Sequence, residues 1–172
     1  MVRERGAKTH VVAPPEVAKR VAEAPQPGEA PLPADDVPAL LRRNATDPDI
    51  SGRPALRFGD RIWTHAELFA ESERFAQLFR SRLDPGRPKH VAVLLDNTPD
   101  YVFALCGTAL AGAVLVGLNN TRRDEHLARD IGYTDVQLIV TEPRQLHLLE
   151  TVRGDLDVPG GLLVSSRFRD AD

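Results

Sequence analysis

The amino-acid sequence predicts an α/β fold, in which a mainly parallel sheet is flanked by helices and accompanied by a small β-hairpin. The first observation is a set of three continuously apolar runs, at residues 90–95, 113–118 and 136–141. A strand with one face in water alternates apolar and polar residues, so these runs indicate strands that are covered on both faces. The second observation is that a helix-like segment separates each run from the next, which is the element order of a parallel sheet.

The amino-terminal part of the chain is predicted to lie outside this fold. Residues 1–33 hold six of the 14 prolines and few residues that could be buried. Such a composition favours a disordered leader, because it cannot bury enough apolar surface to offset the loss of chain entropy. The folded part is therefore expected to comprise residues 34–172.

Two helices are expected before the first apolar run. Asp35 or Asp36 can cap the first helix, and Asp47-Pro48 ends it because the residue before a proline avoids the helical conformation. Thr64 and Glu67 have the spacing of a capping box, in which each side chain accepts a hydrogen bond from the other residue's backbone N–H. This box is expected to begin the longer second helix.

A short hairpin is expected between these helices, and two further elements near the carboxyl end. Residues 54–58 and 61–64 flank Gly59-Asp60, and a two-residue connection with glycine first suits a type II′ turn. After the third apolar run, residues 143–150 are expected to form a short helix and residues 160–165 a further strand.

The helices between the apolar runs have recognisable ends. Gly112 is expected to end the first of them, because glycine adopts the left-handed backbone conformation without a steric penalty. Thr121 is expected to cap the second, with Asp124 and Glu125 placing negative charge where the helix dipole favours it. Gly132 is expected to end that helix.

Composition and charge argue against a nucleic-acid partner. A formal net charge of -3 and a pI near 6.0 supply no positive field for a phosphate backbone. Aromatic residues, at 5%, are too few to offer a stacking platform for bases. The single cysteine, Cys106, excludes an internal disulfide, which fits a reducing compartment, and we therefore expect a cytoplasmic location.

The uncharged stretch at residues 102–118 is the one candidate for a membrane span. Its length is near the lower limit for crossing a bilayer. Three glycines interrupt it, and the β-branched residues Val114 and Val116 near its end are typical of a helix that runs into a strand. We therefore expect a buried α/β segment and no transmembrane segment. The basic residues near the amino terminus are not followed by the apolar core of a signal peptide.

The order of short motifs along residues 36–164 is similar to that of a known family. The motifs are Trp63-Thr64-His65-Ala66-Glu67-Leu68, Asn97-Thr98-Pro99-Asp100, Ala109-Leu110-Ala111-Gly112-Ala113 and Gly117-Leu118-Asn119. Taken together, they resemble the amino-terminal region of adenylate-forming (AMP-binding) enzymes, particularly fatty acyl-CoA synthetases. Asn120-Thr121-Arg122-Arg123, which stands where many members continue with proline, is similar to the very-long-chain or transporter-like acyl-CoA synthetase branch.

The resemblance implies a function for the whole family and none for individual residues here. Full-length relatives use ATP and Mg²⁺ to convert a fatty acid to an acyl-adenylate, and then transfer the acyl group to coenzyme A. The family's phosphate loop ending in Pro-Lys, its acidic ribose-binding residue and its catalytic lysine do not occur in this sequence. We therefore assign no catalytic, cofactor-binding or metal-binding residue, and we expect residues 34–172 to be an incomplete amino-terminal domain that is inactive alone.

A standalone, non-catalytic binding or oligomerisation module derived from the same fold is the alternative. An incomplete parallel sheet leaves an exposed edge and uncovered apolar surface. This alternative predicts a homo-oligomer formed through that edge, or another partner. Fatty acid and coenzyme A are implied as partners of the full-length family only.

Three features resemble sites but favour structural interpretations. Gly107 to Gly112 has the glycine spacing of a P-loop, yet Ala113-Val114 stands where Lys-Ser/Thr is required, and the segment runs from helix into strand instead of strand into helix. Close helix packing is favoured. Cys106 lies among apolar residues and is expected to be a buried, unreactive thiol. The histidines show no metal-binding spacing; they are His10, His65, His90, His126 and His147.

Two polar segments keep a functional alternative. Arg122-Arg123-Asp124-Glu125 could contact an anionic ligand such as a phosphate of coenzyme A, although mixed charge at a helix start is usually a solvated cap. Asp96, Asn97 and Thr98 are predicted to follow a parallel strand at its carboxyl end, where α/β proteins often bind ligands.

Overall fold

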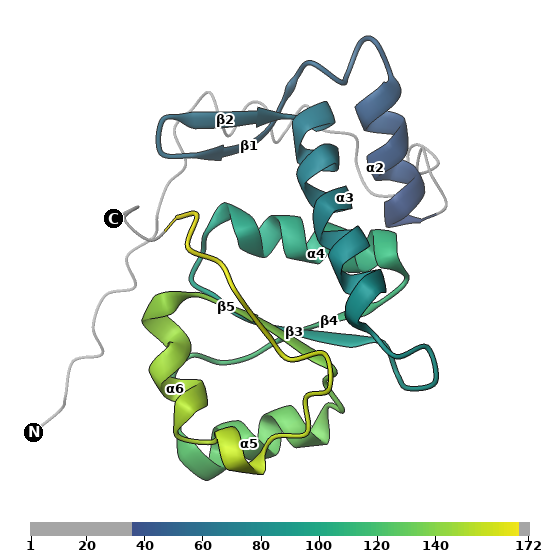
Figure 1. The fold of residues 1–172 in the computed structure, drawn as a ribbon. Coiled ribbons are helices and arrows are strands. Elements are labelled where there is room, and N and C mark those ends of the chain that lie inside the picture. Colours follow the sequence, from purple (N-terminus) through teal and green to yellow (C-terminus); the bar gives the residue numbers. More distant parts are fainter. Residues whose placement is uncertain (1–35, 169–172) are drawn as a thin grey trace, which may run out of the picture. The chain divides into compact units, whose positions relative to one another are not determined.

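The computed structural model describes residues 36–168, apart from the side chain of Asp155 (Figure 1). These residues form one compact unit with a two-stranded sheet and a four-stranded sheet. The predicted disordered leader at residues 1–33 lies outside the described residues.

The first helix and the hairpin form as the sequence predicts. Helix α2 (Val37–Thr46) is capped by Asp36, whose Oδ1 accepts a hydrogen bond of 2.6 Å from the Ala39 N–H. Strands β1 (Pro54–Phe58) and β2 (Arg61–Thr64) pair antiparallel. Of the two loop residues, Gly59 has a positive φ of 57° and Asp60 does not, which agrees with a type II′ turn.

Helix α3 (His65–Arg82) begins at the predicted capping box. The Glu67 N–H donates to Thr64 Oγ1 over 3.3 Å, and the Thr64 N–H donates to Glu67 Oε2 over 2.8 Å. The hydrogen bonds that Glu67 Oε2 accepts from the Thr64 N–H and from the Thr64 hydroxyl lower the pKa of the exposed Glu67 carboxyl below its usual range. The box therefore fixes the point at which the hairpin turns into the helix.

The larger sheet is fully parallel, with the strand order β4-β3-β5-β6. Its central strands, β3 (His90–Leu94) and β5 (Leu138–Thr141), are buried almost throughout, as the apolar runs predict. Its edge strands, β4 (Val114–Gly117) and β6 (Leu162–Val164), are not, and the side chain of Val114 is 55% exposed. The predicted cover on both faces is confirmed only in part at residues 113–118: Ala113 and Leu115 pack on one apolar cluster and Val116 and Leu118 on another, whereas Val114 is exposed.

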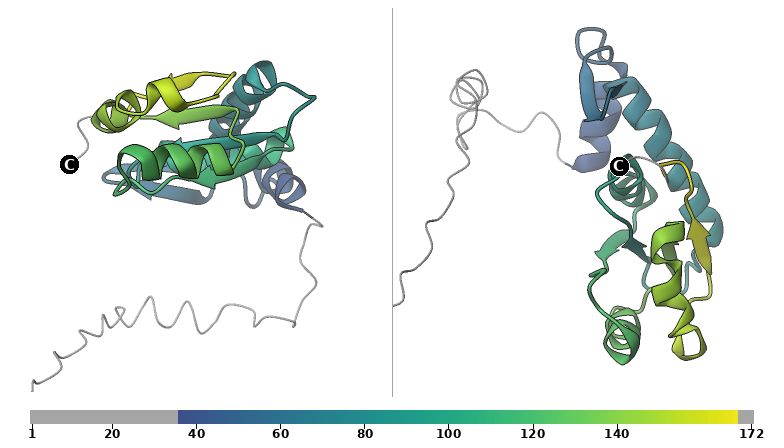
Figure 2. Two further views of the ribbon diagram at one scale, coloured as in Figure 1. Left: turned by 90° about the horizontal axis from the view of Figure 1, so that it is seen from below. Right: turned by 90° about the vertical axis from the view of Figure 1, so that its left-hand side faces the viewer.

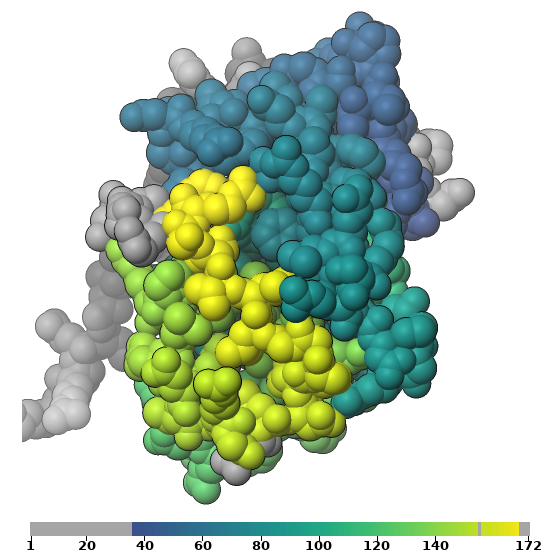
Figure 3. Space-filling view, viewed as in Figure 1, coloured from purple at the N-terminus to yellow at the C-terminus, as the bar shows by residue number. Residues whose placement is uncertain are grey.

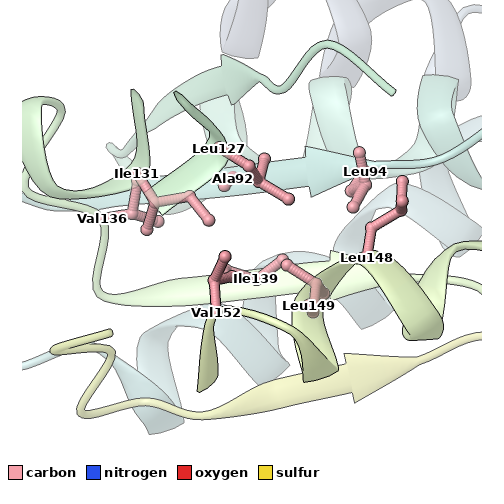
Figure 4. Close-up of a cluster of buried hydrophobic side chains, with 9 residues drawn as sticks. All are labelled: Ala92, Leu94, Leu127, Ile131, Val136, Ile139, Leu148, Leu149 and Val152. Carbon is pink, nitrogen blue, oxygen red and sulfur yellow. The ribbon is translucent and has the colours of Figure 1, made fainter. Parts of the chain in front are cut away.

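Helices cover both faces of this sheet (Figure 1). On one face, α3 and α4 (Pro99–Ala111) pack on Val91, Val93 and Val140. On the other, α5 (Asp124–Tyr133) and α6 (Leu146–Glu150) pack on a second apolar cluster. Figure 4 shows the nine buried side chains of this cluster: Ala92, Leu94, Leu127, Ile131, Val136, Ile139, Leu148, Leu149 and Val152. In Figure 2, right, α2 and the hairpin lie at the end remote from α5.

Helix α5 begins and ends differently from the prediction. Thr121 does not cap it, because the helix begins at Asp124 and its capping position is Arg123; the N–H and Oγ1–H of Thr121 instead donate to Asn119 Oδ1 over 2.8 Å. Gly132 lies inside the helix, and it is Asp135 that adopts the left-handed conformation beyond the helix end, with φ of 47°. Aspartate tolerates this conformation better than most residues.

Residues 102–118 form most of α4 and the edge strand β4. Gly112, with φ of 66° and ψ of 38°, ends α4 as predicted and turns the chain toward β4. No helix among residues 36–168 is long and apolar enough to cross a membrane.

Three short elements lie between β5 and β6. The predicted helix at residues 143–150 begins as a 3₁₀ turn, η1 (Pro143–Gln145), and continues as α6; a second 3₁₀ turn, η2 (Arg153–Asp155), follows. Strand β6 confirms the predicted strand at residues 160–165 in its central part.

Candidate functional site at the carboxyl edge of the sheet

Polar side chains gather where the four parallel strands end. Since the strands are parallel, their carboxyl ends meet at one edge of the sheet. Asp96 follows β3, Asn119 and Asn120 follow β4, Glu142 follows β5, and Ser165 follows β6. The chain leaves β3 toward α4 on one face and leaves the adjacent β5 toward α6 on the other, which is the arrangement at which open α/β sheets bind ligands.

Asp96 connects three of these strand ends. Its backbone N–H donates to Glu142 Oε1 over 2.7 Å, and its carboxylate Oδ1 accepts from Gln145 Nε2 over 2.9 Å. The Asn120 amide also reaches Asp96 Oδ1, at 3.3 Å. Asp96 is therefore held in place by neighbours from the β4 and β5 ends.

A cavity of about 410 Å³ opens beside Asp96. It is lined by residues from the ends of two strands, namely Leu95, Asp96, Asn97, Leu118, Asn119 and Asn120. The lining combines one carboxylate with asparagine amides, which can both donate and accept hydrogen bonds. The arrangement can hold a polar ligand, and it contains no nucleophile or general base fixed against a second catalytic group.

A second polar group at the same edge surrounds Asp100. This side chain, at the start of α4, is 1% exposed. Its Oδ2 accepts a short hydrogen bond from Ser165 Oγ, and its Oδ1 lies 3.4 Å from Arg167 Nη1. Burial raises the pKa of the Asp100 carboxyl, while the hydrogen bond from Ser165 and the charge of Arg167 oppose that rise.

The sequence predicts part of this edge. It places Asp96, Asn97 and Thr98 there, and the structure brings the first two to the cavity. Thr98 instead stands at the amino-terminal cap of α4, where its side chain makes no capping hydrogen bond. Sequence reasoning missed Glu142, although the same rule of strand ends would have found it directly after the third apolar run.

The glycines at 107 and 112 serve the helix and its end, not a phosphate. A Cβ atom on Gly107 would lie 2.7 Å from Phe75 Cβ and 2.9 Å from the Ser72 carbonyl oxygen, so α3 and α4 approach closely there. Cys106 beside it is half-buried, and burial raises the pKa of its thiol. The thiolate, which is the reactive form, is therefore disfavoured.

The histidines do not converge. His65 begins α3, His147 lies in α6, and His90 Nδ1 lies 2.7 Å from the Thr134 carbonyl oxygen. His126 faces Glu125 at 3.9 Å, and His10 lies outside the described residues. Within residues 36–168, no group of three His, Cys, Asp or Glu side chains could hold a metal ion.

The basic pair before α5 is partly engaged within the chain. Arg122 Nε lies 3.4 Å from Asp130 Oδ2. Arg123 Nη1 donates to the carbonyl oxygens of Asn120 and Arg122 over 2.7 and 2.8 Å. A role for this pair toward an anionic ligand stays a prediction.

The structure is an α/β domain with a polar edge at the carboxyl ends of its parallel strands, and comparison with known proteins gives its family. The protein family described as "AMP-binding enzyme" matches residues 41–170 of this chain. Because this match covers most of the sequence, the chain belongs to the AMP-binding enzyme family.

Two relatives show which members are similar in sequence. Steroid-22-oyl-CoA synthetase of Rhodococcus jostii is 46% identical over 90 residues, 52% of this chain and 16% of the relative. Medium/long-chain-fatty-acid–CoA ligase FadD17 of Mycobacterium marinum is 36% identical over 101 residues, 59% of this chain and 20% of the relative. The chain thus spans a fifth or less of the length of these relatives.

A solved structure supports the fold alone. The N-terminal domain of FACL13 from Mycobacterium tuberculosis superimposes with a TM-score of 0.66 at 19% identity, covering 81% of this chain and 37% of that one. The family implies ATP, Mg²⁺ and coenzyme A. Among the described residues no group of three His, Cys, Asp or Glu side chains could hold a metal ion, and the P-loop-like glycines lie in and at the end of a packed helix, so no residue is assigned to ATP or Mg²⁺.

Proposed function

We propose that residues 34–172 form the amino-terminal α/β part of a fatty acyl-CoA synthetase that works in the cytoplasm. Such an enzyme transfers the AMP moiety of ATP to the carboxylate of a fatty acid with release of pyrophosphate, and then transfers the acyl group to the thiol of coenzyme A with release of AMP. Residues 1–33 would be a disordered leader to this domain. The cytoplasmic location is supported by the single free thiol, which suits a reducing compartment.

The observation that carries the proposal is the sequence identity of 36–46% to two ligases whose names specify large apolar acids. One acts, by its name, on a steroid carboxylic acid and the other on medium- and long-chain fatty acids. Both are acyl-CoA-forming enzymes. We therefore propose an apolar carboxylic acid as the substrate of the whole protein.

The chemistry itself would need groups that this chain does not contribute. Charge developing on the phosphate in the transition state must be stabilised by positioned donors and cations. The described residues offer the polar carboxyl edge around Asp96, and the family's phosphate loop does not occur in the sequence. We therefore derive no catalytic step from this chain alone.

We expect the purified 172-residue chain to catalyse no exchange between ATP and labelled pyrophosphate in the presence of Mg²⁺ and fatty acids of varied length. A complete fatty-acid–CoA ligase in the same assay is the positive control. The reason is the missing phosphate loop and lysine. Exchange that depends on a fatty acid would contradict this proposal.

The second candidate is a non-catalytic module that binds a partner or a second copy of itself. It is favoured by apolar side chains along the two open edges of the sheet: Val114 is 55% exposed, Leu162 40% and Val164 47%. A partner could add a strand there, because an open edge presents unpaired backbone groups. A monodisperse dimer in size-exclusion chromatography would support this candidate.

A further inference from the structure

The four residues after β6, Ser165–Phe168, hereafter the exit segment, contact several separate elements. The Ser165 N–H donates to the Thr141 carbonyl oxygen over 2.8 Å, which ties the segment to β5. The Phe168 ring stands edge-on to Phe58 and Trp63, at 5.8 and 6.1 Å between centroids. In the space-filling view the yellow carboxyl-terminal residues lie beside the blue hairpin region (Figure 3).

The exit segment contacts the buried carboxyl group of Asp100. Both oxygens of Asp100 face it: Ser165 Oγ donates to Oδ2, and Arg167 Nη1 lies 3.4 Å from Oδ1. Within the described residues Oδ1 has no hydrogen-bond partner, so the 3.4 Å approach is a charge contact only. A buried acceptor without a hydrogen bond is unfavourable, and more so when it is ionised.

Arg167 does not fully compensate that charge. Its Nη1 lies closer to Glu71 Oε2, at 3.0 Å, than to Asp100 Oδ1. Glu71 also contacts Arg74 at 3.3 Å from within α3. The charged groups facing Asp100 are thus one shared cation, Arg167, and one like charge, Glu71.

We propose that the exit segment is a latch whose closure over Asp100 becomes tighter when that carboxyl takes up a proton. A closed latch buries Asp100 and an open one returns it to water. The proposal does not depend on the ligase function, because it concerns only how the exit segment is held against α4 and the hairpin.

The direction of the pH effect follows from the shift of the Asp100 pKa. Burial raises this pKa in the closed state, so the closed state binds the proton more strongly than the open state. The contribution to closure is therefore fully present below the open-state pKa, and it is lost as the pH rises through the closed-state pKa. Closure strengthens as the pH falls through the interval between these two values.

Hydrogen exchange of the Ser165 amide in the full 172-residue chain tests the latch. After correction for the intrinsic exchange rate, protection is expected to increase by up to about tenfold for each pH unit of decrease within that interval. The Val93 amide, in the buried β3, serves as an internal reference for global opening. A change shared equally by both amides would contradict a local latch.

Three variants sharpen the test. Asp100→Asn should remove the pH dependence at Ser165, and Asp49→Asn, the same change at an exposed carboxylate, should leave it intact. Arg167→Gln should raise the pH at which Ser165 protection begins to increase, because the Arg167 charge lowers the Asp100 pKa. Far-UV circular dichroism verifies folding, and Arg167→Gln decides the matter if Asp100→Asn fails to fold. The proposal would be overturned if Ser165 protection kept the same dependence on pH in Asp100→Asn, or if Arg167→Gln left the pH at which protection begins to increase unchanged.

Discussion

Replacing Gly107 with alanine is expected to lower the free energy of unfolding by about 1–3 kcal/mol, the usual cost of overpacking a well-packed contact. The added Cβ would stand 2.7 Å from Phe75 Cβ and 2.9 Å from the Ser72 carbonyl oxygen. Neither atom can move without its backbone, so α3 and α4 must separate. Urea denaturation followed by circular dichroism measures the loss.

Gly132→Ala is the matched control, because Gly132 also lies inside a helix but has no atom within 4 Å of the point that a Cβ would occupy. There the substitution should raise the free energy of unfolding by about 0.5–1 kcal/mol, since alanine has the higher helix propensity. If Gly107→Ala were stabilised like Gly132→Ala, the close approach of α3 and α4 would be wrong. The packing role of Gly107 would then lose its support.

Replacing Leu94 with alanine is expected to lower the free energy of unfolding by about 2–5 kcal/mol. Leu94 ends β3 and is 0% exposed, within the cluster that joins the sheet to α5 and α6. Removing its side chain leaves a cavity that the central strand cannot close by moving. Thermal and urea denaturation should both report the loss.

Leu105→Ala makes the same chemical change on the solvent side of α4, where the side chain is 49% exposed. It should change the free energy of unfolding by no more than about 0.5 kcal/mol. Equal losses at the two leucines would mean that β3 is not the centre of the core.

The sequence predicts the elements of this fold better than their surroundings. The apolar runs mark the strands, and the capping box and Gly112 mark helix ends, because these signals are local. The exposure of Val114 could not be predicted, since the number of neighbours of a strand depends on the strand order of the whole sheet. Thr121 is not the cap because the helix begins at Asp124, and its hydroxyl donates to Asn119 instead.

The sequence predicts Asp96 as part of the candidate site, but it does not predict the residues that bind Asp96. Asp96 follows a clear strand, so its place at the carboxyl edge could be inferred. Gln145 and Glu142 reach it from 49 and 46 residues away, and their side-chain directions depend on the turn into α6. Ser165 meets Asp100 across 65 residues, which requires the register of β6 against β5. No local pattern contains that information.

The central claim is that this α/β domain belongs to a fatty acyl-CoA synthetase, and the mass of the native polypeptide tests it most directly. An antibody raised against residues 34–172 would be used on extracts of the host, and the captured species weighed by mass spectrometry. We predict a species several times heavier than 18.9 kDa, the mass of the present chain. A native species of 18.9 kDa would contradict the claim and would favour the non-catalytic module.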